Sequence, residues 1–287
     1  MAKIWVTGAN GQLGSELREL SKSCKDFEFV FTDMPDLDLT KHDTVKKVFK
    51  EIKPDVVINA AAYTAVDLAE SESEKAYAVN TYAVANLATL CSAGKAFLIH
   101  VSTDFVFDGK RSCPYHEEVA ANPVGTYAAS KNKGEIEILL NTRHAAIIRT
   151  SWLYGNHGNN FMKTILEKGR KGEKLSVVYD QVGTPTWSAD LAKVVLEMAR
   201  HAKKINGVEL FHYSNEGVAS WYDFAYEILN LSNSKSALVP VDSKDFPRPA
   251  PRPAYSVLNK GKIKKFLGIE IPYWKDSLKK CLEAQKA

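Results

Sequence analysis

The chain has 287 residues, of which 45% are hydrophobic and 25% charged, and its formal net charge is +4. This is the composition of an ordinary globular protein, and the charge excess is too small and too dispersed to indicate binding to nucleic acid. A mild positive charge does suit an acidic small molecule such as a phosphorylated substrate. No stretch approaches the length of a membrane span, so we expect no association with a membrane.

The four cysteines are widely scattered and form no C-x-x-C pair. This argues against zinc and thioredoxin-type chemistry and predicts no metal site. Nothing in the pattern requires disulfides, and reduced thiols are typical of the cytosol. The chain enters an apolar segment at Lys3 without the charged lead and long apolar region of a signal peptide. We therefore predict a cytoplasmic protein.

The first apolar segment, residues 4–7, predicts a strand, and glycines spaced as G-x-x-G-x-x-G follow it. Gly8 permits a tight turn, Gly11 lets the backbone approach a pyrophosphate, and Gly14 lets the next helix, residues 15–20, pack closely on the strand. The pyrophosphate would bind the free N–H groups at the start of that helix. The alternative is a tight structural turn without a ligand. The cofactor-binding candidates in this turn are Gly8, Asn10, Gly11, Gln12 and Leu13.

Asp33 follows the second predicted strand, residues 29–32. An acidic residue about 20 residues after such glycines commonly binds the adenosine ribose, and its carboxylate would repel the 2′-phosphate of NADP. This reading favours NAD over NADP; the alternative is a capping or turn aspartate. Asp38 and Leu39 lie where a side chain could meet the adenine edge.

A third predicted strand, residues 56–58, is a continuous apolar run of the kind buried in parallel sheets. It ends in Ala60, Ala61 and Ala62, whose small side chains would let a cofactor pass close over the strand end. Binding-type residues at successive strand ends predict an α/β fold with a Rossmann-type doubly wound parallel sheet. The long helix expected over residues 72–91 could also serve as a dimer surface.

The fourth predicted strand, residues 97–101, ends next to Thr103. Tyr127 and Lys131 are four residues apart in a predicted helix over residues 127–140, so their side chains share one face. A nearby ammonium favours the phenolate and lowers the pKa of a tyrosine, which would let Tyr127 exchange a proton with a carbonyl or hydroxyl oxygen. Thr103 would bind the same oxygen. The alternatives are a cap or turn for Thr103 and a solvated helix face for the pair.

After a fifth strand at residues 146–148 the pattern loosens. We predict that residues 1–150 form the dinucleotide-binding domain with the catalytic residues, and that residues 151–287 form a smaller substrate-binding lobe interleaved with the sheet. Asn160 is a plausible N-cap of a helix, and Arg252, in a proline-rich loop, is a candidate phosphate clamp. Further helices are predicted over residues 189–199, 222–231 and 260–267.

Together these motifs are similar to those of the extended short-chain dehydrogenase/reductase superfamily, which shares the glycine turn, Thr103, Tyr127 and Lys131. Within that superfamily the chain resembles the dTDP-4-dehydrorhamnose reductase family over nearly its whole length. The segments that carry this resemblance are Asn59–Glu70, Ser102–Gly109, Arg149–Tyr154, Gly158–Phe161, Asp180–Thr186 and Arg252–Ser256. The first of these segments is specific to the family.

The resemblance implies reduction of the C4 keto group of dTDP-4-dehydro-L-rhamnose by NADPH or NADH, giving dTDP-L-rhamnose. It implies that Tyr127 protonates the developing alkoxide, that Lys131 lowers the pKa of Tyr127 and binds the nicotinamide ribose, and that Thr103 orients the reacting oxygen. Some relatives dimerise and bind magnesium; a homodimer is therefore an open expectation, whereas no residue here is assigned as a metal ligand. The substrate-binding candidates are Thr64, Val66, Thr103, Asp104 and Phe105, with Trp152 for the sugar ring, and Asn160 and Arg252 for the nucleotide end.

The chain departs from the family pattern at two places. Phe105 stands where the family usually has tyrosine, which removes one hydrogen bond to the sugar, and Gly125-Thr126 precedes Tyr127 where Asn-x is usual. Phe105 also argues against a nucleotide-sugar dehydratase, because phenylalanine cannot act as the acid that eliminates water. A nucleotide-sugar epimerase, a non-catalytic NAD(P)-binding regulatory subunit and a related 4-keto deoxysugar as substrate stay open as alternatives.

Overall fold

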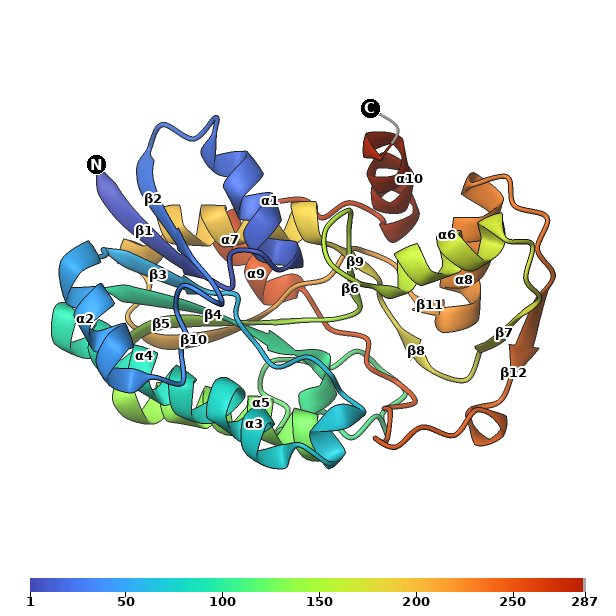
Figure 1. Ribbon diagram of the computed structural model, residues 1–287, viewed down its shortest axis with the longest axis horizontal. Coiled ribbons are helices and arrows are strands. Elements are labelled where there is room, and N and C mark those ends of the chain that lie inside the picture. Colours follow the sequence, from blue (N-terminus) through green and yellow to red (C-terminus); the bar gives the residue numbers. More distant parts are fainter. Residues whose placement is uncertain (286–287) are drawn as a thin grey trace.

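A six-stranded sheet forms the centre of the computed structural model, which describes residues 1–285. Its strands are β1 (Ala2–Thr7), β2 (Phe27–Thr32), β3 (Val56–Asn59), β4 (Phe97–Thr103), β5 (His144–Thr150) and β10 (Gly207–His212). All neighbours pair in parallel, in the order β10-β5-β4-β3-β1-β2 (Figure 1). The chain order reverses between β1 and β3, which confirms the predicted doubly wound sheet.

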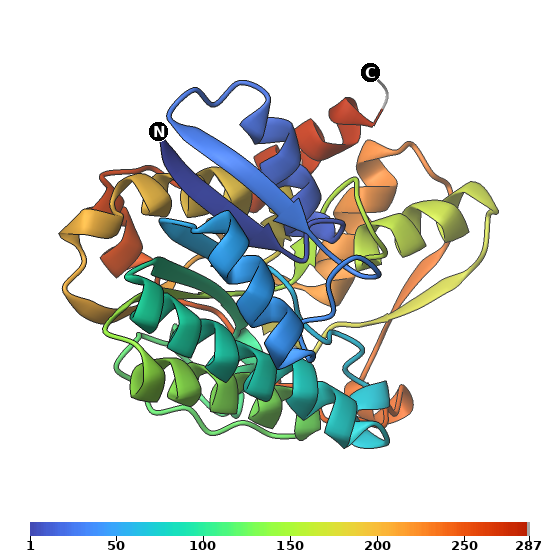
Figure 2. The ribbon, with the colours of Figure 1, turned by 60° about the vertical axis from the view of Figure 1, so that its left-hand side comes forward.

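Helices cover both faces of this sheet (Figure 2). On one face lie α1 (Gln12–Ser21), α7 (Ser188–Arg200) and α9 (Gly261–Leu267), and on the other lie α2 (His42–Ile52), α4 (Ala83–Gly94) and α5 (Thr126–Asn141). Side chains alternate along each strand, so Ile4 and Val6 of β1 pack with α1 and α7, whereas Trp5 packs with α2 and α4. The sheet is therefore buried on both faces, as a parallel sheet requires.

The helix expected over residues 72–91 is interrupted by a π turn. It consists of α3 (Ser73–Tyr77), the π turn η2 (Ala78–Tyr82) and α4. In the π turn Asn80 Nδ2 donates to Ser130 Oγ at 3.0 Å, and Thr81 Oγ1 donates to the Ser130 carbonyl at 2.8 Å. The interruption thus ties this helix to α5, which carries Tyr127 and Lys131.

A second lobe lies beside the sheet and has its own core, built around Met162, Phe224 and Trp274 (Figure 1). Its elements are β6 (Leu153–Tyr154), α6 (Phe161–Arg170), β7 (Leu175–Val178), β8 (Val182–Gly183), β9 (Thr186–Trp187), β11 (Ala219–Ser220), α8 (Trp221–Leu231), β12 (Leu238–Val241) and α10 (Trp274–Ala284). Short 3-10 helices are η1 (Leu68–Glu70), η3 (Asp104–Val106), η4 (Ala202–Lys204) and η5 (Ser243–Asp245).

The second half of the chain contributes to both units. After the lobe begins at β6, the chain returns to the sheet as α7 and β10 and again as α9. A boundary near residue 150 therefore marks the end of the contiguous sheet segment, and the sixth strand comes from beyond it. Within residues 1–285, no helix combines the length and the apolar character needed to cross a bilayer.

Candidate active site

The turn between β1 and α1 borders a cavity of about 340 Å³ at the carboxyl ends of β1, β2 and β3. Gly8 has a φ of +72°, and a Cβ there would lie 2.5 Å from the Ala61 nitrogen. A Cβ at Gly14 would lie 2.2 Å from the Gly8 carbonyl oxygen. The close approach of these backbones therefore requires both glycines, and the free N–H groups of the first turn of α1 lie next to them. This geometry fits the pyrophosphate of a dinucleotide.

Most of the predicted cofactor residues come together around this cavity. Those that line it are Gly8, Gly11, Asp33, Asp38, Leu39, Ala60, Ala61 and Ala62. Tyr127 and Lys131 lie outside the lining of this cavity, and so do the three remaining candidates of the glycine turn. Leu13 is buried in the core, the Gln12 amide donates to the Leu153 carbonyl at 3.4 Å, and Asn10 uses its backbone N–H to bind Asp33. Gln12 and Leu13 would therefore bind a phosphate through their backbone N–H groups and not through their side chains.

The carboxylate of Asp33 holds the turn that follows β2. Its Oδ2 accepts the Asn10 N–H and its Oδ1 accepts the Met34 N–H, each at 2.7 Å. The capping role is thus present in the structure, and the carboxylate still lines the cavity where a ribose would lie. Asp38 is also bound locally, because its Oδ1 accepts the hydroxyl and the N–H of Thr40, which lowers the pKa of Asp38.

Tyr127 lies in the first turn of α5, and Glu70 holds the start of that helix. Glu70 accepts the Thr126 N–H at 2.8 Å and the Thr126 hydroxyl at 2.9 Å. Gly125 has a φ of +93°, a conformation that favours glycine. The unusual Gly125-Thr126 pair therefore forms a turn whose threonine is bound by Glu70, and this positions the tyrosine that follows.

The Tyr127 side chain lies beside Thr103 and Phe105 at the end of β4. Burial raises the pKa of Tyr127 to about 12; a hydrogen bond with Thr103 opposes this rise, and the charge of Asp104 adds to it. Phe105 packs edge-on against the Tyr127 ring, with 5.9 Å between ring centroids. Burial also raises the pKa of Asp104 to about 7, and the hydroxyls of Ser256 and Thr103 oppose this rise. Asp104 Oδ2 is buried and has no hydrogen bond of good geometry in the described part of the chain. Thr103, Asp104, Phe105 and Tyr127 thus form one cluster.

Lys131 shares a helix face with Tyr127, but its amine contacts β4. Lys131 Nζ donates to the Val101 carbonyl at 2.8 Å and lies 3.3 Å from His100 Nε2. Burial lowers the pKa of Lys131 to about 8, with Glu135 opposing the shift. The structure differs from the expectation that the pKa of Tyr127 is lowered, because burial raises the pKa of the phenol and the Lys131 side chain reaches the Val101 carbonyl of β4. The effect of Lys131 on the pKa of Tyr127 stays a prediction.

Three supporting residues were not among the predicted site residues. His100 contacts the Lys131 amine, Asn80 holds the loop at Tyr63, and Glu70 binds the first turn of α5. Only His100 had a local signal, because it is a lone histidine inside the apolar segment 97–101. Asn80 binds Tyr63, 17 residues away, and Ser130, 50 residues away, and Glu70 binds Thr126, 56 residues away, so their roles depend on the folded chain.

Comparison with known proteins identifies the family. A family model described as the RmlD substrate binding domain matches residues 2–287. The chain belongs to this family. It is 39% identical to a dTDP-4-dehydrorhamnose reductase of Aggregatibacter actinomycetemcomitans, over 97% of this chain and 98% of that protein. A dTDP-4-keto-6-deoxy-D-glucose reductase of Streptomyces niveus is 36% identical, over 90% of this chain and 89% of its own length.

A solved structure of the RmlD family has the same fold. It is the dTDP-4-dehydrorhamnose reductase of Bacillus anthracis str. Ames in complex with NADP, which matches with a TM-score of 0.94 and 36% identity over 99% of this chain and 100% of that one. The family resemblance inferred from the motifs is thereby confirmed. Fold and family together place this chain among nicotinamide-dependent oxidoreductases.

In this RmlD-family chain, Arg252 lies next to the Tyr127 cluster. Its guanidinium donates to Asp67 Oδ1 at 2.9 Å and lies 5.7 Å from the centroid of the Phe105 ring. Trp152 adopts a left-handed backbone conformation, with φ of +45°, and stacks on Trp221 with 3.7 Å between centroids. One face of the Trp152 ring is therefore covered by protein. Of the other substrate candidates, Thr64 is exposed and Val66 half-buried, both in the loop that leads to Asp67.

Asn160 has a structural role that accounts for its polar atoms. It is the N-cap of α6, because its Oδ1 accepts the Lys163 N–H at 3.1 Å, as predicted. Its Nδ2 donates to Gln12 Oε1 at 3.0 Å and to the Gly155 carbonyl at 2.8 Å. Because these bonds use the side-chain amide, the structure does not favour the predicted contact of Asn160 with the nucleotide end.

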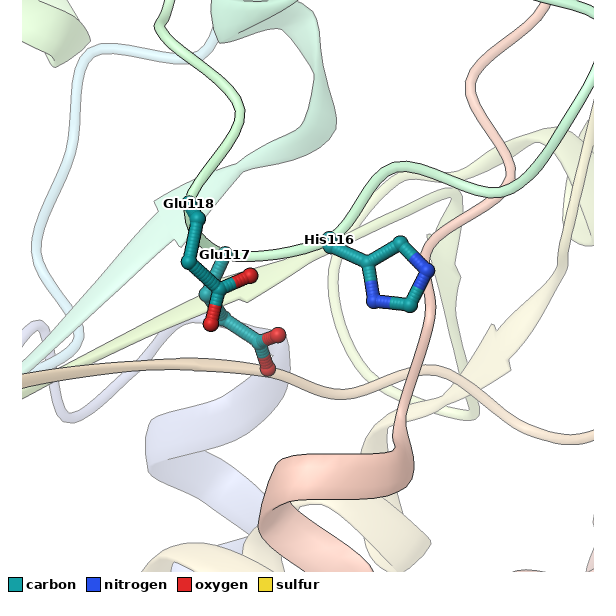
Figure 3. A group of neighbouring side chains, drawn as sticks. All are labelled: His116, Glu117 and Glu118. Atoms are coloured by element: carbon teal, nitrogen blue, oxygen red, sulfur yellow. The ribbon is translucent and has the colours of Figure 1, made fainter.

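Residues 1–285 contain one group of three side chains that could hold a metal ion, His116, Glu117 and Glu118 (Figure 3). They are consecutive in one loop, and Glu117 already accepts the His212 N–H at 3.0 Å. His116 and Glu118 are exposed, and exposed acidic groups are common without an ion. No ligand set for magnesium is assigned.

Proposed function

We propose that this chain catalyses the NAD(P)H-dependent reduction of the C4 keto group of dTDP-4-dehydro-L-rhamnose, which gives dTDP-L-rhamnose for the synthesis of surface polysaccharides. The observation that carries the proposal is the packing of Tyr127 beside Thr103 and Phe105 at the end of β4 in a chain of this family. The cavity at the glycine turn, at the ends of β1, β2 and β3, supports the binding of a dinucleotide. Four free cysteines and the nicotinamide dependence support a location in the cytoplasm.

The residues at the glycine turn are those that would hold the cofactor, whose nicotinamide supplies the hydride when it is bound. Gly8 and Gly11 would lie along the pyrophosphate, and the alanines that end β3 would lie under the dinucleotide. Asp33 presents a carboxylate where the adenosine ribose would lie, and a carboxylate there disfavours a 2′-phosphate. We therefore propose that this chain accepts NADH alongside NADPH.

The side chains around β4 would handle the substrate oxygen. Tyr127 gives its proton to the oxygen that becomes a hydroxyl. Thr103 orients that oxygen and stabilises the charge that develops on it. Lys131 binds the nicotinamide ribose and supplies the proton that restores the Tyr127 phenol. The groups proposed for these roles belong to β4 or to α5, which packs beside it.

The substrate end is proposed from the groups around Phe105. Arg252 offers a cation for the diphosphate, and the buried oxygen of Asp104 offers an acceptor for a sugar hydroxyl. Trp152 would present one ring face to the sugar, with Thr64 and Val66 in the facing loop. Because Phe105 cannot donate a hydrogen bond, a related 4-keto deoxysugar is the second candidate substrate.

The test is oxidation of NADPH, followed by its absorbance, with the 4-keto sugar made in situ from dTDP-glucose by the enzymes that precede this step. Tyr127→Phe should lower turnover by about 10²- to 10⁴-fold while cofactor binding is kept, because only the proton donor is lost. Failure of the folded, cofactor-binding wild type to turn over with NADPH or NADH would overturn the proposal. A purified protein that retains its nicotinamide through repeated turnovers would indicate an epimerase instead.

We further propose that two copies pair through α5. Ile136, Leu139 and Leu140 form an exposed apolar stripe on this helix, with exposed fractions of 38%, 54% and 72%. A stripe of this kind is stabilised when a second surface covers it. Sedimentation velocity of the wild type and of Leu140→Lys tests this; a monomer in both would refute it.

A further inference from the structure

His100 is a buried polar residue that the proposed reaction does not use. It lies on β4 between apolar neighbours and is fully buried. Its Nε2 is 3.3 Å from Lys131 Nζ, and its Nδ1 is 3.1 Å from the side-chain nitrogen of Asn59. The imidazole thus links the end of β3 to the amine on α5.

The neighbours of Asn59 determine which imidazole nitrogen carries the proton. Asn59 Oδ1 lies 3.2 Å from the Ala61 nitrogen and 2.8 Å from Thr7 Oγ1. A backbone N–H can only donate, so the side-chain oxygen of Asn59 must face Ala61 and its NH₂ group must face His100. The Nδ1 of His100 therefore accepts a hydrogen bond, and the proton of a neutral imidazole lies on Nε2.

This tautomer directs an N–H at the amine of Lys131. An ammonium has three donors and no acceptor, so two donors would oppose each other, whereas a neutral amine can accept the hydrogen bond. The other groups facing Lys131 are the Val101 carbonyl on β4 and, on its own helix, Glu135. Glu135 is already bound to Arg149 and Ser102. Tyr127, one turn earlier on α5, is a neutral phenol near pH 7.

We propose that His100 is a positioning residue for Lys131, in which the chain Thr7–Asn59–His100 presents an Nε2–H donor to the amine and favours its uncharged form. Burial, which lowers the pKa of Lys131 to about 8, acts in the same direction. The consequence for catalysis rests on the proposed reductase function. If Lys131 returns a proton to Tyr127 in each turnover, its amine must be protonated to do so. His100, which favours the uncharged amine, then sets the pH above which turnover falls.

The first test is NMR of the enzyme labelled with ¹⁵N in histidine, with His100 assigned by His100→Gln. We expect an unprotonated Nδ1 and a protonated Nε2 from about pH 6 to 9, because the imidazole stays neutral there. A protonated Nδ1, whether in the other tautomer or in an imidazolium, would overturn the proposal. This readout does not depend on activity, so it separates a failure of this inference from a failure of the reductase assignment.

The second test compares His100→Leu with His100→Gln. The leucine removes the donor, and we expect both the Lys131 titration, followed by ¹⁵N NMR of labelled lysine, and the basic limb of kcat/KM to move up by about one pH unit. The glutamine keeps an N–H at the end of its side chain and should bring both values back toward wild type. An unchanged Lys131 titration in a folded His100→Leu enzyme would overturn the proposal. If the leucine variant does not fold, the tautomer measurement decides.

Discussion

Arg149 and Lys131 are two buried cations beside β4, and they differ in what holds them. Arg149 donates from Nε and Nη2 to the two oxygens of Glu135, at 2.9 and 2.6 Å. Lys131 lies four residues before Glu135 on the same helix, yet within residues 1–285 the hydrogen-bond partners of its amine are a carbonyl and an imidazole. Because the carboxylate is taken by Arg149, the lysine stays free to change its protonation. The paired cation suits a structural role, and the unpaired one suits chemistry near neutral pH.

The largest effect should come from removing the unpaired cation. We expect Lys131→Met to lower turnover by about 10²- to 10⁴-fold, because the ribose contact and the proton supply are both lost. The free energy of unfolding at pH 7 should stay the same or rise, since a buried ammonium without a carboxylate is costly. Steady-state kinetics and urea unfolding measure the two quantities. Lys133→Met, an exposed lysine on the same helix, is the matched control and should change neither. Strong destabilisation by Lys131→Met would break the contrast with Arg149.

For Arg149, the paired cation, we expect that removal of its partner mainly lowers the free energy of unfolding. Glu135→Ala leaves Arg149 buried without its carboxylate, and breaking a buried pair costs about 3–5 kcal/mol of stability. Urea unfolding monitored by circular dichroism measures this cost. Glu137→Ala, next to Lys133, should cost less than about 1 kcal/mol, because that pair is partly exposed. Similar losses in the two variants would show that burial does not decide the strength of these pairs.

A pH titration of stability separates the two cations directly. The pKa of Lys131 falls from 10.5 to about 8 on folding, so between these values the unfolded chain binds a proton that the folded chain does not. The free energy of unfolding should therefore rise with pH across this window, by about 3 kcal/mol in total. Urea unfolding from about pH 7.5 to 9.5 lies above the titration of Asp104 and below that of the Tyr127 phenol. Burial also raises the pKa of the Cys91 and Cys281 thiols, which lowers stability in the upper part of this window, so the Lys131 contribution is the difference between wild type and Lys131→Met. This difference should rise with pH; a difference that does not change with pH would assign the slope to other groups.

The sheet and the cofactor turn could be predicted because their signals are local. The apolar segments at residues 4–7, 56–58 and 97–101 lie in strands β1, β3 and β4, and the glycines lie in one turn. β10 and α10 were not predicted. β10 lies at the edge of the sheet with half-buried residues, so its apolar pattern is weak. α10 begins two residues after Pro272, and lysines and acidic residues interrupt its apolar positions.

The site was harder to predict than the fold. Thr103 and Tyr127 could be assigned to one site because each lies at the end of an element that the pattern reveals, and the structure has both in the cluster at the end of β4. The direction of the Lys131 side chain was not predicted, because it depends on which carbonyl and which imidazole the sheet brings within reach. Asn160 shows the same limit: its type and position predicted a cap, but the additional bond to Gln12 arises only from the packing of the second lobe on α1.

The smallest expected effect concerns Ser102 and Thr103, two neighbouring residues of β4, and tests whether the contrast between Arg149 and Lys131 extends to them. Ser102 donates to Glu135 on the side of the paired cation, whereas Thr103 meets Tyr127 on the side of the reaction. Ser102→Ala should cost about 1.5–3 kcal/mol, the usual contribution of a hydrogen bond to a charged group, and leave turnover near wild type. Thr103→Ala should lower kcat, because a donor to the developing charge is lost. It should also cost about 0.5–2 kcal/mol of stability, because Thr103 caps η3 by accepting the Phe105 N–H at 3.2 Å. Urea unfolding and steady-state kinetics of Ser102→Ala and Thr103→Ala measure the two effects. If Ser102→Ala impairs kcat as much as Thr103→Ala does, the structural and reactive sides of β4 are coupled, and the division drawn between Arg149 and Lys131 fails.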